Sequence, residues 1–371
     1  MTLEQIAGAA LMVLFLADVF LTVLYARAGT GLLAPVWNRC VWALFKGIAG
    51  VFGRGRTTIL SFAGPVIVIC LIAFWALGLT LGAALVIQPE LGTAIRPSSG
   101  GTSTEFVTAL LVAGNSLSIV GGGDYSPHSS GTRLLFLLNS LIGASVLSLV
   151  LSYLVQVYSA LRERNVLAMT VHQLTGETGD AAEMLARLGP DGDFSNATSE
   201  LSNLVRSLVM TKEAHHFYPL LFYFRFSDPL YSVSRFSFVL LDLTTLIGTT
   251  LDQQMYGTFV RSAPVGALQR SALLLLKTLD RHFPTQSDAH AAVNPGNYAA
   301  AAEALQRAGI SVRPNSQAYA DRRRRWEPLV CRVARTMGYD MDEIDCRRRS
   351  EERRVGKECT SVCRSRWSPY P

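Results

Sequence analysis

The stretch that decides the fold is Thr102-Ser-Thr-Glu-Phe-Val-Thr-Ala-Leu-Leu-Val-Ala-Gly-Asn-Ser-Leu-Ser-Ile-Val-Gly-Gly-Gly-Asp-Tyr-Ser-Pro127. Thr102 and Glu105 have the spacing of a capping box, which predicts a helix start. Residues 106–117 then predict an apolar helix of about three turns, which is too short to cross a bilayer. A segment rich in glycine follows this helix and ends in an acid.

Long apolar runs lie on both sides of this stretch, at residues 59–87 and 133–161, and a third lies at residues 6–26. Each is long enough to span a membrane. The first could instead be a cleaved signal peptide, but no basic stretch precedes it and Asp18 interrupts it, so we predict a retained span. Asp18 has two interpretations. It is either a functional acid within the membrane or an acid that faces a neighbouring helix or an interface.

Residues 31–52 carry their apolar side chains on one helical stripe, with Asn38, Arg39 and Lys46 off it. This pattern predicts an amphipathic helix that lies in the membrane interface, and a spanning helix with a polar inner face is the alternative. Arginine and lysine are concentrated at residues 27–56, where no acid occurs. The positive-inside rule therefore predicts that residues 27–58 and the C-terminal region are cytoplasmic, and that the N-terminus and residues 88–132 are outside.

The order of apolar span, short re-entrant helix, glycine-rich segment, acid and second span resembles the two-helix pore module of the potassium-channel superfamily. The resemblance covers residues 59–160. The family filter pattern, Thr-Val-Gly-Tyr-Gly-Asp, aligns here with Ile119, Val120, Gly121, Gly122, Gly123 and Asp124. Together with Ser118, which precedes them, these residues form the predicted selectivity filter. Backbone carbonyl groups in such filters replace the hydration shell of a cation. The resemblance implies a homotetramer in the lipid bilayer that conducts monovalent cations, K⁺ first among them, and it implies no other cofactor.

Two residues depart from the family pattern. The family threonine, which helps to form the innermost ion site, is Ile119, and the family tyrosine, which braces the filter, is Gly122. Three consecutive glycines form a less constrained backbone than one braced by an aromatic ring. We therefore predict a pore with weak selectivity for potassium. The alternative, from another functional class, is a non-conducting, membrane-anchored helical interaction or regulatory protein with a vestigial pore.

Asp124 and Gly143 each have two interpretations. In the family the acid at the position of Asp124 braces the filter from behind, whereas aspartate is also common in turns. Gly143 lies where family members often bend to open, which makes it a candidate gating hinge. Glycine at this position also allows close packing of membrane helices.

Residues 161–348 have the composition of a soluble domain and predict helices at 161–174, 181–188, 201–216, 231–249, 265–283, 298–308 and 322–337. No dinucleotide-binding or phosphate-binding loop is present. His215 and His216 point to different helix faces and predict no metal site. The aromatic residues of 217–226 favour a core or a membrane interface. The run Arg322–Arg325 predicts a solvated helix start, with contact to lipid phosphates as the alternative.

The predicted fold class is therefore an all-α membrane protein. It has an N-terminal transmembrane helix (1–28), an interfacial amphipathic helix (29–58), a two-helix plus re-entrant pore-loop channel module (59–160, with spans at 59–87 and 133–160 and the pore helix and filter at 102–127) and a cytosolic α-helical domain (161–348). We place the protein in the plasma membrane as a multi-pass protein. We expect no enzyme activity, no metal and no nucleic acid, and an unidentified cytosolic regulator remains open as a partner.

Composition supports this division. The chain is 49% hydrophobic and 17% charged, with a net charge of +6, and a charged fraction of roughly 25% is usual in soluble domains. The six cysteines predict no disulfide framework. Residues 349–359 match the conceptual translation of a sequencing adapter, so we exclude 349–371 as an artefact, with a basic lipid-binding tail as the alternative.

Overall fold

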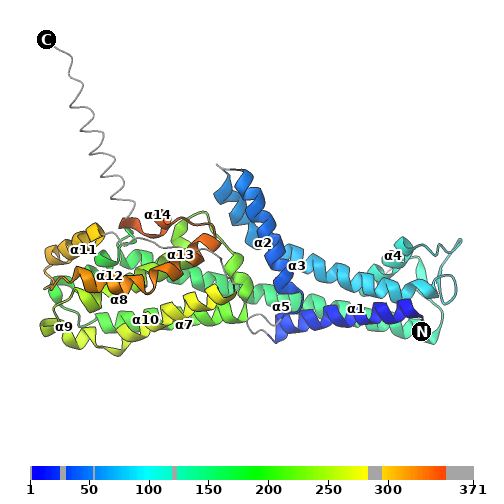
Figure 1. The fold of residues 1–371 in the computed structure, drawn as a ribbon. Helices are drawn as coiled ribbons and strands as arrows, with labels where there is room; N and C mark the ends of the chain where they lie inside the picture. The colour runs from blue at the N-terminus through cyan, green and yellow to red at the C-terminus, as the bar shows by residue number, and fades with distance from the viewer. Residues whose placement is uncertain (1, 26–30, 53–54, 119–122, 283–294, 348–371) are drawn as a thin grey trace, which may run out of the picture. The chain divides into compact units, whose positions relative to one another are not determined.

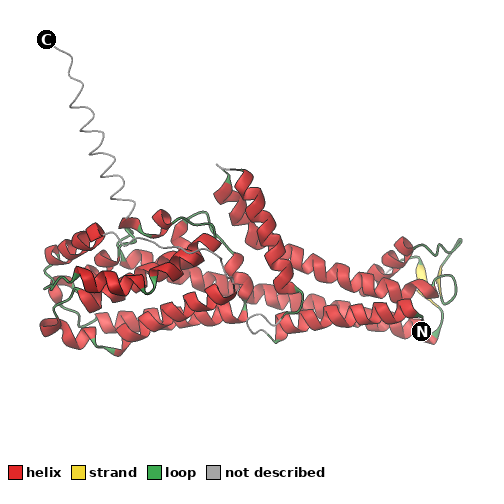
Figure 2. Ribbon diagram, in the orientation of Figure 1, coloured by secondary structure: helices red, strands yellow, loops and turns green. Residues whose placement is uncertain are grey.

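The computed structural model describes residues 2–25, 31–52, 55–118, 123–282 and 295–347, and these are almost entirely helical (Figures 1 and 2). They form two compact units, residues 1–48 with 62–159 and residues 49–61 with 160–371. The boundaries fall inside three helices, α2 (Ala34–Val51), α3 (Arg56–Ile87) and α5 (Ser130–Leu174), so each of these contributes to both units.

The first unit contains the N-terminal helix, most of α2 and the segment that connects the two longest helices. Besides parts of α2, α3 and α5, its elements are α1 (Leu3–Val19), a π-helical turn η1 (Phe20–Leu24), a 3₁₀ turn η2 (Gln88–Glu90), β1 (Ile95–Pro97), α4 (Phe106–Leu117) and β2 (Tyr125–Pro127). The antiparallel pair β1–β2 was not predicted from the sequence, and it aligns Arg96 with Ser126.

Three helical segments of the described chain are long and apolar enough to cross a membrane: Leu3–Leu24, Arg56–Glu90 and Ser130–Leu174. They coincide with the three predicted spans. The last continues without a break to Leu174, as the apolar run and its polar continuation predicted. The helix α4 is apolar but has only 12 residues, so it cannot cross a bilayer by itself.

Small residues on α3 let α1 approach closely. A β-carbon added at Gly78 would overlap the ring of Phe15, and one added at Gly82 would overlap Met12. Close packing through glycine is typical of membrane helices. In lipid there is no hydrophobic driving force for helix association, so helices associate largely through the van der Waals contacts that small residues allow. Phe15, Val19 and Trp75 then form a buried cluster with residues of α2 and α5.

Helix α2 is not among the candidate spans found in the described residues, and its interfacial position stays a prediction. Its inward face includes the buried residues Ala34, Asn38 and Trp42, whereas Val36 and Leu44 of the apolar stripe are exposed. Asn38 lies off the apolar stripe, as the sequence indicated. The apolar stripe is therefore the outward face of this helix, and a more mixed face packs on the protein.

The second unit is a helical domain in which α8 is the central, almost completely buried helix. Its elements are α6 (Ala181–Leu188), η3 (Pro190–Gly192), α7 (Ala197–Phe217), η4 (Pro219–Tyr223), η5 (Pro229–Tyr231), α8 (Val233–Thr249), α9 (Gln253–Val260), α10 (Ala263–His282), α11 (Pro295–Arg307), α12 (Ser316–Arg324), α13 (Glu327–Thr336) and α14 (Met341–Ile344). All of the predicted helices are present with small shifts except the last, and α9, α14 and most of α12 were not predicted.

Part of the aromatic segment and one histidine of the pair, His215, belong to the core of this unit, whereas Phe217 is exposed. Residues 220–224 are buried, which agrees with the predicted core position. His215 is buried, and its Nδ1 lies 2.9 Å from the Thr211 carbonyl oxygen. Burial, and then the nearby charge of Arg164, lower the pKa of His215 to about 3, so the ring is neutral at physiological pH.

The predictions for residues 322–337 were wrong. The segment is divided between the end of α12 and the whole of α13, because Trp326 adopts a non-helical conformation as N-cap and Pro328 follows it in the first turn. The arginines thus end a helix. Arg323 is also not solvated: it is 1% exposed and forms ion pairs with Glu327 and Asp345.

Candidate functional site

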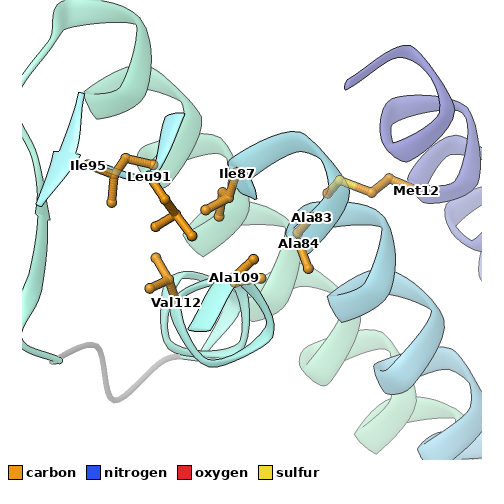
Figure 3. Close-up of a cluster of buried hydrophobic side chains, with 9 residues drawn as sticks. Met12, Ala83, Ala84, Ile87, Leu91, Ile95, Ala109 and Val112 are labelled. Carbon is orange, nitrogen blue, oxygen red and sulfur yellow. The ribbon is translucent and has the colours of Figure 1, made fainter. Parts of the chain in front are cut away.

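The short helix α4 is held against α3 by an apolar cluster. Ala109, Val112 and Ala113 of α4 are buried together with Ala84 and Ile87 of α3. Figure 3 shows Ala109 and Val112 turned toward Ile87 and Leu91, with Met12 of α1 against Ala83 at the far side of α3. The helix is therefore packed within the unit, and in sequence it lies between the two long apolar helices α3 and α5.

The C-terminal end of α4 is attached to α5 by one hydrogen bond and one close contact. The buried Asn139 side chain donates from Nδ2 to Ser116 Oγ at 2.9 Å, and Ser116 Oγ donates to the Ala113 carbonyl oxygen at 2.9 Å. One turn further along α5, a β-carbon at Gly143 would overlap the Leu117 carbonyl oxygen. Glycine at 143 is thus required for this approach, which supports the packing interpretation and leaves the hinge as a prediction.

The residues predicted to form the filter are described in part. Ser118 is the C-cap of α4, and Gly123 has a φ of +136° that side chains rarely adopt. Ile119, Val120, Gly121 and Gly122 lie outside the described residues. A β-carbon at Gly123 would lie 2.6 Å from Asn115 Nδ2, so the backbone here passes close to the last turn of α4.

Asp124 is fixed through its backbone. Its carbonyl oxygen accepts hydrogen bonds from the Ser98 amide at 2.7 Å and the Ser98 hydroxyl at 3.1 Å. The Asp124 side chain is exposed, and its carboxylate has no hydrogen bond or ion pair within the described part of the chain. The hydrogen bonds from Ser98 to the Asp124 carbonyl oxygen extend the pairing of β1 with β2, the two strands on either side of α4 in the sequence. The bracing role of Asp124 stays a prediction.

A cavity of about 240 Å³ lies beside this segment. It is lined by Asn115, Ser116 and Ser118 at the end of α4, by residues 123 and 125–127 after the filter segment, and by Ser140 of α5. Hydroxyl and amide groups form much of its wall. Polar walls of this kind are compatible with ordered water, which a cavity lined only by apolar groups would exclude.

Asp18 is the second polar centre of the first unit. It is completely buried. Its Oδ2 accepts from the Trp75 indole N–H at 2.7 Å, and its Oδ1 accepts from the amides of Leu33 and Ala34 at 2.7 and 3.3 Å. The two amides belong to the start of α2, where a helix end attracts negative charge. Asp18 therefore faces neighbouring helices and joins α1, α2 and α3.

The predicted capping box was wrong. Helix α4 starts at Phe106, as predicted, but Glu105 is itself the N-cap and forms no side-chain cap bond. Thr102 therefore lies too far from the helix to cap it. Sequence analysis also missed Asn115 and Ser116 as contact groups. Their signal was a pair of polar residues in the last turn of an otherwise apolar helix.

No group of three or more histidine, cysteine, aspartate or glutamate side chains in the described ranges could hold a metal ion. Of the described cysteines, Cys40 and Cys70 form no disulfide. Cys331 is buried, whereas Cys40 is exposed on α2, which is compatible with contact to lipid.

No protein-family model and no solved structure matches the chain. The chain is 23% identical over 220 residues to a protein of Bacillus subtilis (strain 168) described as "Uncharacterized membrane protein YdjJ". The match covers 59% of this chain and 62% of the relative, so it spans less than two thirds of that protein's length. Together with the three long apolar helices, this likeness fixes the general class. The chain is a helical membrane protein.

Proposed function

We propose that this protein is a tetrameric channel of the potassium-channel type that conducts monovalent cations across the plasma membrane, with a cytosolic helical domain on residues 161–348. Each chain would contribute one pore module, and four modules would surround one ion path. The permeant ion would be K⁺ with weak discrimination against Na⁺, because Ile119 and Gly122 replace the threonine and the tyrosine of the family pattern.

The observation that carries the proposal is the attachment of α4. A 12-residue apolar helix lies between two long spans and ends at Ser118, directly before the glycine-rich segment. The Asn139–Ser116 bond and the contact at Gly143 hold this end against α5. Irregular backbone at membrane depth is tolerated only where it is buried in protein or lines a water-filled path, and a pore satisfies this requirement.

Exposed apolar side chains favour assembly with other copies. Val107 and Leu111, one turn apart on α4, are 71% and 59% exposed. In a single chain these side chains would face lipid from a re-entrant helix. In a ring of four modules, the same face of α4 would be covered by the neighbouring chain, so the proposed tetramer gives this face a partner.

Cation flux into liposomes tests the proposal. The chain should end after Arg348, because Arg347 is bonded to Asp180 and belongs to the folded domain. We expect influx of both K⁺ and Na⁺ that barium or the Gly121→Asp substitution blocks. Strong preference for K⁺ would contradict the weak selectivity. A matched control is Gly101→Asp, which adds the same charge in an open loop.

The second candidate is a membrane-anchored interaction or regulatory protein with a vestigial pore. The same two departures, Ile119 and Gly122, favour it. It predicts that the tetramer, or any other assembly, shows no flux of either ion under any applied potential, and that flux stays absent when Ile119→Thr and Gly122→Tyr restore the family pattern. Recovery of flux by these two substitutions would instead support a channel architecture with a decayed filter.

A further inference from the structure

Two buried arginines in the second unit use main-chain carbonyl groups as partners. Arg164, on α5, is 1% exposed and donates from Nη1 to the Leu221 carbonyl oxygen and from Nη2 to that of Phe224, both at 2.9 Å. Arg225 is 2% exposed. Neither forms an ion pair with an acid within the described part of the chain.

Arg225 joins three separate parts of the chain. Its Nε donates to the Met337 carbonyl oxygen at 3.1 Å, and its Nη2 donates to that of Gly338 at 3.4 Å. Its Nη1 donates at 3.0 Å to the carbonyl oxygen of Thr57, in the first turn of α3. The guanidinium carbon also lies 4.3 Å from the centre of the Tyr339 ring.

Two further contacts complete this junction. The Tyr339 hydroxyl donates to the Phe226 carbonyl oxygen at 2.8 Å and accepts from the Phe226 amide at 3.2 Å. Gly338, with a φ of +74°, leaves room for the buried Leu60 of α3, because a β-carbon there would lie 2.8 Å from Leu60 Cδ1. The first turns of α3 are thus packed on the corner at 337–339.

Residues 221–226 therefore contact both the start of α3 and the part of α5 that contains Arg164. Arg164 brings α5 to this segment, and Arg225 brings the start of α3 to it. A buried cation without an acidic partner is costly, and carbonyl groups alone satisfy it only in a fixed geometry. A planar guanidinium presents donors on separate nitrogens in a rigid fork, whereas all three donors of a lysine come from a single nitrogen.

We propose that residues 221–226, with Arg164 and Arg225, form a clamp that couples the start of α3 to α5 and restrains the cytoplasmic end of the pore. Both arginines act as positioning residues, because they hold the helices and do not contact the ion. The gating part of this inference rests on the proposed channel function. The mechanical part, coupling of two helix ends through one segment, does not depend on conduction.

Hydrogen exchange on the full chain in liposomes tests the mechanical part. We expect Arg164→Gln to increase amide exchange in residues 221–226 and also in residues 57–61, which Arg164 does not contact. A purely local role would increase exchange at 221–226 alone, and that result would overturn the coupling. Unchanged exchange in both segments would overturn it as well. Arg206→Gln, at an exposed position of α7, is the matched control and should change neither.

Two additional variants keep the test decisive if Arg164→Gln does not fold. Arg164→Lys keeps the charge but replaces two donor nitrogens with one. We therefore expect amide exchange at residues 57–61 to lie between that of Arg164→Gln and that of the wild type. Exchange equal to that of the wild type would mean that charge alone matters and would overturn the clamp. Tyr339→Phe removes only the hydroxyl bonds to Phe226, and we expect a smaller increase in exchange at both segments. Protection identical to that of the wild type in Tyr339→Phe would overturn the role assigned to this hydroxyl.

Flux tests the gating part separately. If the clamp restrains opening, Arg164→Gln should raise basal cation flux by about fivefold or more. This factor is at the lower end of the changes found between coupled sites in proteins. Coupled exchange with unchanged flux, in a protein whose wild type conducts, would overturn the restraint on the pore. A wild type that does not conduct would overturn the proposed function, and the exchange data alone would then decide on the clamp.

Discussion

Asp18 shows how one acid inside a membrane segment can be satisfied without a cation. Three donors reach its two oxygens, one from the Trp75 indole and two from the first amides of α2. Each donor would otherwise be buried without a partner, and the start of a helix favours a negative charge. The carboxylate therefore connects three helices at one point.

The Asp18→Asn substitution tests this connection. An amide group would direct its own N–H groups at donors, so at least one of the three bonds would be lost. We expect the free energy of unfolding to fall by about 1–3 kcal/mol, the range for leaving a buried polar group unsatisfied. Thermal unfolding in detergent measures this change. Glu4→Gln removes the same charge at an exposed site and should have almost no effect; equal stability of both variants would contradict the connection.

The direction in which Gly143→Ala changes the stability of the protein distinguishes the packing interpretation of Gly143 from the hinge interpretation. Alanine is favoured over glycine inside a helix by roughly 0.5–1 kcal/mol, so Gly131→Ala, which meets almost no neighbouring atoms in α5, should be neutral or stabilising. Gly143→Ala should be destabilising, because its β-carbon would overlap the Leu117 carbonyl oxygen. Thermal unfolding of both variants is the measurement. Stabilisation by Gly143→Ala would remove the packing role and favour the hinge.

At the scale of elements, an ionic cluster attaches the end of the described chain to the helical domain. Arg347 bonds to Asp180, the N-cap of α6, at 2.5 Å and lies 3.2 Å from Asp242 of α8. Arg323 pairs with Asp345 close by. Removal of one partner from a buried ion pair costs about 3–5 kcal/mol because a buried charge is left uncompensated.

This attachment predicts a dependence on pH. Burial disfavours the ionised form of Asp180, but the charge and hydrogen bonds of Arg347 and the bonds from the α6 amides outweigh it, so the pKa lies below its ordinary value of 3.8. An acid whose pKa is lowered on folding contributes stability above its unfolded pKa, and this contribution is lost as the pH falls through the folded value. Stability should therefore decrease as the pH falls below about 4.

Arg347→Gln should flatten that decrease and destabilise the protein by roughly 3 kcal/mol near neutral pH. Chemical unfolding of the full chain, followed by its tryptophan fluorescence, to which the buried Trp326 contributes, measures both effects. The matched control is Arg313→Gln, which breaks an ion pair with Asp252 in which the arginine side chain is 60% exposed, and such surface pairs contribute about 0–1 kcal/mol. Similar losses in the two variants would contradict the assigned role.

The same elements show what sequence can and cannot predict. Apolar length fixed the three spans and α4, because the bilayer and the helix rise set the number of residues needed. The local sequence pattern gave the wrong prediction at Arg323. A run of four consecutive arginines predicted a solvated side chain, but Arg323 is buried. Its partners Asp242 and Asp345 are distant in sequence, and only the fold brings them together. Asn139 and Ser116 were likewise visible as polar residues in apolar helices, but their bond depends on how α4 meets α5.

The distribution of charged residues along the whole chain predicts the orientation of the protein in the membrane. Residues 19–89 contain no acid, and their five basic residues all lie between 27 and 56. Positive charge next to spans is retained on the cytoplasmic side. Three spans then place residues 88–132 outside and the helical domain of residues 161–348 inside, and the clamp and the proposed filter would lie on opposite sides of the membrane.

Labelling of single introduced cysteines with a membrane-impermeant maleimide tests this orientation. Ser99→Cys, in the exposed loop after β1, should react in intact spheroplasts, whereas Ser202→Cys, on the exposed side of α7, should react only after permeabilisation. Because Cys40 is also exposed, its replacement by serine provides the background for both variants. If instead Ser202→Cys reacted in intact spheroplasts and Ser99→Cys only after permeabilisation, the topology would be the inverse of the predicted one. It would also place the proposed outer mouth at Asp124 in the cytoplasm, so the channel proposal would lose its predicted direction even if flux were observed.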